Sequence, residues 1–195
     1  MSKNLLVVYL LIVLALNRVG AQGINEHWPT ELGKELLKFN KLLNTKDDFS
    51  MYPSPNCQSN NERFYILNNV SISQVVKYIY IGRVLTCRSG GCKDNYNNNE
   101  TSGYEYFEYF MLFDSLGTVK KVKIYNYQAT HGYEISAAAW LKQFIGYDGS
   151  SNLHPGKQVD AIAGASISVQ AISTEIMNRV RCLGNTLEGI PKNSP

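Results

Sequence analysis

The fold of this chain is decided by the stretch Tyr104-Glu-Tyr-Phe-Glu-Tyr-Phe-Met-Leu-Phe-Asp114, which a second apolar run, residues 118–127, follows after Ser-Leu-Gly117. Aromatic and β-branched residues are frequent in these runs, and such a composition is typical of strands. Residues 114–117 have the composition of a turn. Because so short a connection keeps the two runs together, they predict an antiparallel hairpin.

Two earlier segments have the same character. Residues 63–67 predict a short strand, and residues 75–87 predict a long one that is rich in β-branched and aromatic side chains. Residues 44–61 are polar, contain Pro53 and Pro55, and are predicted to be a loop. Residues 93–103 are rich in asparagine and predict a solvated loop.

Three segments, residues 30–43, 133–144 and 169–180, have helical periodicity. Glu35 and the neighbouring lysines lie largely off the apolar stripe of the first segment. Helices packed on an antiparallel sheet make an α+β domain, which is the predicted fold class. The three stripes consist of Leu32, Leu36, Phe39 and Leu43; of Ile135, Ala138, Leu141 and Ile145; and of Val169, Ile172, Ile176 and Val180.

Residues 1–21 have the pattern of a secretory signal peptide. The apolar core, Leu5 to Leu16, is shorter than the roughly 20 residues that a membrane helix needs, and Val19-Gly-Ala21 supplies small residues for cleavage. An uncleaved anchor is the alternative. The leader contains Lys3 and Arg18 but no acidic residue, so the mature chain is nearly neutral and nothing in it points to nucleic acid.

Four cysteines, Cys57, Cys87, Cys92 and Cys182, follow the leader. An even number of cysteines in an exported protein suggests disulfides. Two glycines between Cys87 and Cys92 let the chain turn back, so this pair is predicted to be bridged, which would leave Cys57 with Cys182. Four cysteines allow three connectivities. A redox-active pair or a metal site is an alternative, but no histidine lies near Cys87 and the spacing is not that of a zinc site.

The most informative motif is Asp160-Ala-Ile-Ala-Gly-Ala-Ser-Ile-Ser168, directly before the third predicted helix. A glycine and an alanine at this point allow another group to approach the backbone closely. The first N–H groups of a helix have no intrahelical partner, and the helix dipole favours negative charge there. Ser166 is therefore expected where a phosphate would be stabilised. An ordinary small-residue turn before a packed helix is the plain alternative.

This motif resembles the modification motif of the FMN-binding domain family, which includes the C subunit of the sodium-pumping NADH:quinone oxidoreductase and the G subunit of the Rnf complex. The family motif is roughly Asp-Ala/Gly-x-Ser/Thr-Gly-Ala-Thr/Ser, and a flavin transferase joins the FMN phosphate to its last hydroxyl as a phosphoester. Asp160, Gly164, Ala165 and Ser166 match it. Ala163 replaces a usual Ser or Thr, and Ser166 replaces the commoner Thr.

The resemblance extends over about residues 75–182 and includes a loop that, in the family, ends a strand and precedes the helix that faces the flavin. Ala129-Thr-His-Gly132 corresponds to the family's Glu-Thr-Pro-Gly-like segment, with Thr130 and Gly132 matching. The resemblance implies that Thr130, His131 and Gly132 approach the ring, while Asp160, Gly164, Ala165, Ile167 and Ser168 surround the attachment residue Ser166. His131 is either a contact or proton donor to the ring or an ordinary loop histidine.

The expected organisation is a signal peptide (1–21), an N-terminal helix and loop (22–61), an FMN-binding domain (62–184) and a tail (185–195). The resemblance implies an exported carrier in the periplasm or cell envelope, matured by a flavin transferase and exchanging electrons with a membrane or periplasmic partner. The cofactor supplies the electron chemistry, and the protein binds and orients it.

Two other functions fit parts of the sequence. Gly164-Ala-Ser-Ile-Ser168 is close to a hydrolase nucleophile elbow, with His131 and Asp160 as candidate triad partners of Ser166. The final residue is not glycine, and no histidine follows His154, so the order of an α/β-hydrolase fails, although unrelated triads use other orders. The other possibility is a secreted, disulfide-stabilised binding module without a cofactor.

Overall fold

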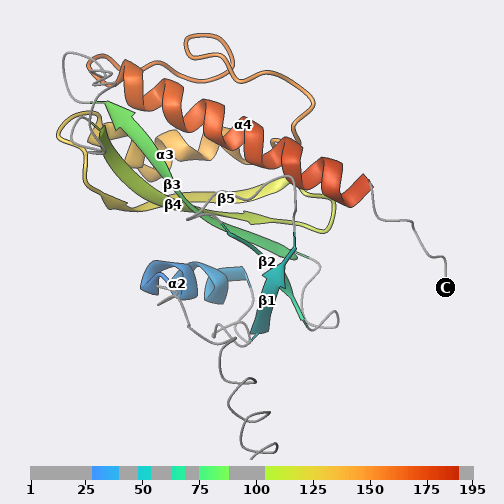
Figure 1. Ribbon diagram of the computed structural model, residues 1–195. Helices are drawn as coiled ribbons and strands as arrows, with labels where there is room; N and C mark the ends of the chain where they lie inside the picture. Colours follow the sequence, from blue (N-terminus) through green and yellow to red (C-terminus); the bar gives the residue numbers. More distant parts are fainter. Residues whose placement is uncertain (1–27, 40–47, 54–62, 69–74, 88–103, 189–195) are drawn as a thin grey trace, which may run out of the picture.

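A computed structural model describes residues 28–39, 48–53, 63–68, 75–87 and 104–188 (Figure 1). In chain order the elements are α2 (Thr30–Phe39), β1 (Phe49–Tyr52), β2 (Arg63–Leu67), β3 (Tyr78–Cys87), β4 (Tyr104–Phe113), β5 (Val119–Tyr127), the 3₁₀ helix η2 (Tyr133–Ser136), α3 (Ala138–Leu141), the 3₁₀ helix η3 (Lys142–Phe144) and α4 (Ser166–Glu188).

The five strands form one antiparallel sheet in the order β1-β2-β3-β4-β5, so every strand pairs with its neighbour in the chain. The β3–β4 ladder runs from Tyr78 opposite Phe113 to Cys87 opposite Tyr104. β4 and β5 form the hairpin that the sequence predicts. The α+β fold class is confirmed.

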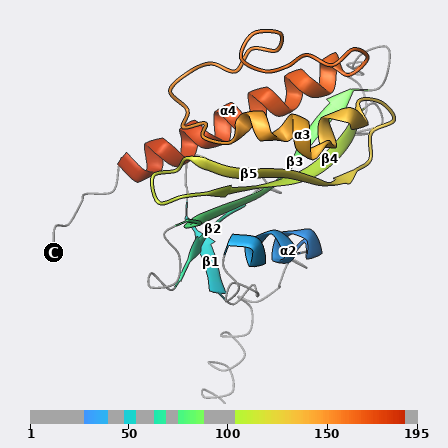
Figure 2. The ribbon, with the colours of Figure 1, turned by 180° about the vertical axis from the view of Figure 1, so that it is seen from behind.

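Helices cover both faces of the sheet. α3 and α4 lie on one face, and α2 lies on the other (Figures 1 and 2). Two hydrophobic clusters fill the layers: α4 contributes Ile172 and Ile176 to the larger one, and α2 contributes Leu32 and Leu36 to the smaller one, all fully buried. Burial of such side chains is the main force that holds the layers together.

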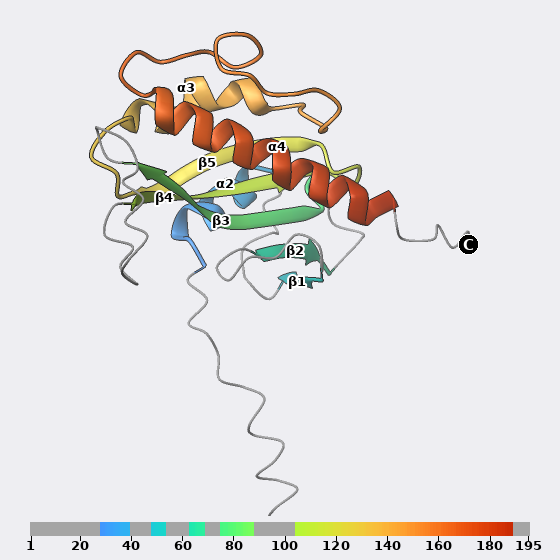
Figure 3. The ribbon, with the colours of Figure 1, turned by 45° about the horizontal axis from the view of Figure 1, so that its top comes forward.

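α4 is fastened to the sheet by a polar contact inside this apolar layer. Glu175 accepts hydrogen bonds from the hydroxyls of Tyr80 on β3 and Tyr109 on β4, at 3.0 and 3.2 Å, and from Nε of Arg179 at 2.7 Å. Near the start of α4, Ser168 lies 3.4 Å from the hydroxyl of Thr86. Since Thr86 comes late in β3 and Tyr80 comes early, α4 runs antiparallel to β3; Figure 3 shows it above the strand.

Glu35 of α2 is buried, although the helical periodicity placed it largely off the apolar stripe. Its carboxylate accepts from Lys38 at 2.8 Å and lies 3.5 Å from Lys121 and 3.4 Å from Lys123, both on β5. Helical periodicity does not reveal this burial, because two of the three lysines around Glu35 come from β5. Burial raises the pKa of Glu35, but these three lysines lower it more, so the net shift is downward.

The segment 44–61, predicted to be a loop, contains strand β1. Phe49 packs on Trp28 and Tyr52 packs on Tyr78, with ring centroids 6.0 and 5.2 Å apart. Four residues carry little local signal, and contacts from distant parts of the chain determine the strand. The described residues of 44–61 are 48–53, and the remainder lies outside the described part.

The single helix predicted for residues 133–144 is wrong. Ala137 is extended, with ψ at 125°, and separates η2 from α3, which continues directly into η3 at Lys142. Of the predicted stripe, Ile135 and Leu141 are buried, whereas Ala138 and Ile145 are exposed.

The remaining helix boundaries differ modestly from expectation. α4 begins at Ser166 and continues through Gly184 to Glu188, beyond the expected start of a tail. α2 is described as far as Phe39, and residues 40–43 lie outside the described part. Within the described residues, no helix combines the length and the apolar character needed to cross a membrane. The predicted signal peptide lies outside the described residues.

Candidate functional site

The motif Asp160–Ser168 consists of a loop, residues 160–165, and the first three residues of α4. Gly164 has φ of +80°, a left-handed conformation that favours glycine. Ala165 is buried, and its carbonyl accepts the hydrogen bond from Val169 N at 2.9 Å. Ser166 is the first residue of α4, and its side chain is exposed. Its hydroxyl therefore lies at the helix N-terminus, as the sequence predicts.

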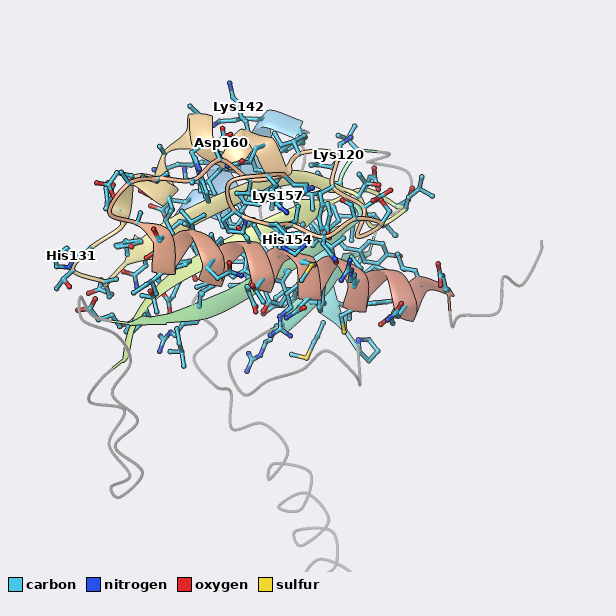
Figure 4. All side chains as sticks on the ribbon, turned by 90° about the horizontal axis from the view of Figure 1, so that it is seen from above. Lys120, His131, Lys142, His154, Lys157 and Asp160 are labelled. Carbon is cyan, nitrogen blue, oxygen red and sulfur yellow. The ribbon has the colours of Figure 1, made fainter. Side chains whose placement is uncertain are left out.

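α3 and η3 hold the beginning of this loop in place. Trp140 donates from Nε1 to the carbonyl of Asp160 at 3.0 Å, and Asp160 N donates to Gln143 Oε1 at 2.7 Å. These bonds fix the backbone and leave the Asp160 side chain exposed, on the same face as Lys142 (Figure 4). The backbone of Asp160 is therefore held against α3 and η3, at the start of the loop that leads to α4.

The loop Ala129–Gly132 is fixed by a buried carboxylate on β4. Thr130 donates to Glu105 from its backbone N at 2.8 Å and from its hydroxyl at 2.9 Å, and Glu105 is only 7% exposed. The Nδ1 atom of His131 lies 3.0 Å from the same hydroxyl. Figure 4 shows His131 at the end of the molecule where α4 begins.

The same loop docks on the first turn of α4 through Ser168. Tyr127 donates to the carbonyl of His131 at 2.6 Å, and its hydroxyl lies 3.2 Å from Ser168 Oγ. Ser168 is buried, and a Cβ on Gly132 would approach its Oγ to 2.6 Å. The structure thus brings Thr130, His131 and Gly132 to the start of α4. Ser168 is buried at this contact, whereas Ser166 is exposed.

Tyr127 reaches this point because of a bulge in β5. Tyr109 pairs with Ile124 and Glu108 pairs with Asn126, so Tyr125 is an extra residue in the ladder. The extra residue shifts the alternation, and Tyr127 therefore faces α4 together with Ile124. Burial raises the pKa of Tyr127, although the hydrogen bond from Ser168 opposes the shift. The hydroxyl consequently stays protonated and acts as a donor.

Sequence reasoning missed Glu105, Tyr127 and Tyr133. Glu105 gave a faint signal, because it is an acidic residue in an aromatic strand. Tyr127 required the bulge to be known. Tyr133, 67% exposed and set edge-on against Tyr127, and Ile167, 45% exposed, place apolar surface on the loop and on the first turn of α4.

The structure does not assemble the triad of a hydrolase. Among the described residues, no hydrogen bond joins Ser166 to His131 or Asp160. Nδ1 of His131 is directed to Thr130, and Asp160 is tied by its backbone to Trp140 and Gln143. A triad requires the base within hydrogen-bond reach of the nucleophile and a third group that orients the base.

Comparison with known proteins identifies the domain. Residues 96–180 match the FMN-binding domain family, whereas no curated protein matches the chain. Within the described residues, the matched segment includes β4, β5, the loop Ala129–Gly132, α3 and most of α4. Residues 96–180 are therefore an FMN-binding domain, and FMN is the cofactor of this protein.

Proposed function

We propose that Ser166 carries FMN through a covalent phosphoester and that the protein transfers electrons outside the cytoplasm. The observation that carries the proposal is the position of Ser166 within the FMN-binding domain. It is an exposed hydroxyl on the first residue of a long helix, whereas Ser168, the next hydroxyl along the helix, is buried and hydrogen-bonded.

The start of α4 fits a phosphate. Ala165 precedes the helix and has no side-chain acceptor for the first N–H groups, so these donors can bind an external anion. Among the described residues, apart from Gly164 and its two chain neighbours, no atom lies within 4 Å of the point where a Cβ on Gly164 would stand, so there is room beside the backbone. The partial positive charge at a helix N-terminus adds electrostatic stabilisation.

Attachment requires a flavin nucleotide whose FMN phosphate is activated as a phosphoanhydride, together with a flavin transferase. The oxygen of Ser166 would form the new P–O bond, the phosphoanhydride P–O bond would break, and the nucleoside monophosphate would leave. The hydroxyl proton would pass to a base of the transferase. An exposed serine on the first residue of α4 is accessible to a second enzyme, which supports this assignment.

The chain's other contribution is to position the ring. Tyr133 and Ile167 supply exposed apolar surface on either side of the contact between the loop and the helix, and Gly132 brings the loop close to α4. FMN, once bound, supplies one- and two-electron chemistry. An isoalloxazine ring over this surface would remove it from water. The sequence of residues 1–21 supports export.

The proposal is tested by expressing the protein with an active flavin transferase and illuminating a denaturing gel. A phosphoester survives denaturation, so the wild-type band should fluoresce, as should Ser166→Thr. Ser166→Ala should be dark. Ser168→Ala and Ser151→Ala, which alter a buried and an exposed serine, are matched controls and should fluoresce. A fluorescent Ser166→Ala band would show that the attachment site is elsewhere.

A further inference from the structure

The buried carboxylate Glu105 is connected to an exposed histidine through a single hydroxyl. Glu105 lies on β4 and is 7% exposed, while Thr130 donates to it from both its backbone N and its Oγ1. The Thr130 hydroxyl also lies 3.0 Å from Nδ1 of His131. Glu105, Thr130 and His131 thus form a continuous hydrogen-bonded chain from the sheet to the loop.

The direction of each bond in this chain follows from the number of hydrogens available. A carboxylate only accepts, so the single hydroxyl hydrogen of Thr130 is committed to Glu105. The Thr130 oxygen can then only accept from His131, which requires a hydrogen on Nδ1. In the neutral imidazole the other nitrogen, Nε2, is consequently an acceptor.

We infer that Glu105, acting through Thr130, holds His131 in the Nδ1–H tautomer so that Nε2 exchanges protons with the flavin. The inference rests on the proposed function, because it requires a ring near the Ala129–Gly132 loop. If a redox partner supplied two electrons to a bound flavin, the protonated imidazole would be placed to release a proton from Nε2 to the ring. It would return to the neutral Nδ1–H form and be reprotonated from water. Glu105 and Thr130 are positioning residues in this scheme.

Other contacts near the Ala129–Gly132 loop hold the backbone of His131 and leave its imidazole ring bonded to Thr130. Tyr127 on β5 donates to the backbone carbonyl of His131, and Ser168 on α4 supports Tyr127. Besides burial, the negative charges of Glu134 on η2 and Glu105 raise the pKa of Tyr127. The charged and titratable groups described around the loop include Glu105, Glu134, Tyr127 and Tyr133. Of these four, Glu105 is the one hydrogen-bonded to Thr130 within the described part of the chain.

The tautomer can be measured directly in full-length mature protein prepared without the transferase. Nitrogen-15 NMR distinguishes protonated from unprotonated ring nitrogens, and wild-type His131 should have hydrogen on Nδ1. In Glu105→Gln, the side-chain amide can donate to Thr130, whose hydroxyl then donates to Nδ1, so the hydrogen should move to Nε2. His154, an exposed histidine in another loop, is the internal control and should not change.

A second pair of variants keeps the test decisive if Glu105→Gln does not fold. Thr130→Val removes the connecting hydroxyl with little change in shape and should give a mixture of tautomers, whereas Thr130→Ser should retain the Nδ1–H form. A wild-type His131 with hydrogen on Nε2, or identical tautomers in Thr130→Val and Thr130→Ser, would overturn the inference. None of these results depends on flavin attachment.

The link to the cofactor has its own readout in flavin-loaded protein. The reduction potential is measured against pH in the wild type, His131→Gln and Glu105→Gln. Both variants should change the slope of the reduction potential against pH, and over the same pH range. Profiles that match the wild type would contradict proton exchange through His131. If no flavin attaches, the proposed function fails, while the tautomer measurement still decides whether Glu105 controls His131.

Discussion

Gly132 is the residue at which the Ala129–Gly132 loop meets α4. Its φ of +85° lies in the left-handed region, and a Cβ would approach Ser168 Oγ to 2.6 Å and the Tyr127 hydroxyl to 3.1 Å. Glycine is therefore required here both for its backbone conformation and for lack of space. The sequence identified this residue through its motif, but the reason for the glycine depends on Ser168 and Tyr127, which belong to other elements.

Gly132→Ala should destabilise the protein more than Gly156→Ala, in which the only cost is a side chain on a residue with positive φ. Gly156 also has positive φ, at +77°, but beyond its two chain neighbours no described residue lies within 4 Å of the added Cβ, so Gly156→Ala should cost about 1–2 kcal/mol. Crowding at Gly132 should add roughly 1–3 kcal/mol. Urea unfolding of both variants measures the difference.

A double variant checks the origin of that difference. Ser168→Ala removes the oxygen nearest to the added methyl group, so Gly132→Ala combined with Ser168→Ala should be less destabilised than the sum of the single changes. Equal losses in Gly132→Ala and Gly156→Ala, or strict additivity in the double variant, would refute close docking of the loop on α4.

At the scale of elements, α2 is attached to the sheet by charge as well as by apolar packing. The burial of Leu32 and Leu36 could be predicted from helical periodicity, because the apolar stripe of one helix is a local property of the sequence. The burial of Glu35 could not, since it depends on Lys121 and Lys123 from β5. The same distinction explains why the β4–β5 hairpin was predicted and β1 was not: the hairpin is local, whereas β1 depends on Trp28, Tyr65 and Tyr78.

The lowered pKa of Glu35 predicts a specific pH dependence. A carboxyl whose folded pKa lies below its unfolded value of 4.5 contributes stability above that value and loses it as the pH falls through the folded pKa. Glu35→Gln should therefore cost about 2 kcal/mol at neutral pH and progressively less in acid. Urea unfolding over a pH series gives the result.

Lys34→Gln is the matched control, because Lys34 is exposed on the same helix. It should leave the free energy of unfolding nearly unchanged at neutral pH. A Glu35→Gln variant that loses the same stability at neutral and acid pH would contradict the assignment of the lysine cluster as the cause.

The geometry of α4 against β3 restricts the disulfides. Cys182 is disulfide-bonded, and Cys87 directly follows Thr86, which contacts Ser168 at the opposite end of the helix. Ser168 and Cys182 are separated by about 21 Å along the helix axis, whereas bridged cysteines have Cα atoms within about 7 Å. Cys87 is therefore excluded as the partner of Cys182.

We predict that Cys182 pairs with Cys57 and that Cys87 pairs with Cys92; Cys57, Cys92 and the Cys87 side chain lie outside the described part of the structure. Peptide mapping without reduction should recover these two linked pairs. A Cys92–Cys182 linkage would show that the pairing predicted from the glycine-rich connection is wrong.

On the scale of the whole molecule, the sheet separates the α2 layer from the layer that contains the candidate site. α2 covers one face, while α3 and α4 cover the other (Figures 1 and 2). The candidate site is built by the start of α4, the loop before it and the Ala129–Gly132 loop after β5. The α+β class and most strands could be predicted because strand composition is strong in this chain. The broken segment 133–144 and the bulge that turns Tyr127 toward α4 could not, since both arise when the layers pack together.

The central claim is a covalent bond between FMN and Ser166, and the mass of the Ser166-containing peptide tests it most directly. Protein exported from cells with an active transferase would be denatured, digested and compared with protein from cells that lack the enzyme. Only the first sample should contain this peptide heavier by FMN less one water, with fragmentation placing the group on Ser166. An unmodified Ser166 peptide, in cells where the transferase modifies another FMN-binding domain, would contradict the claim.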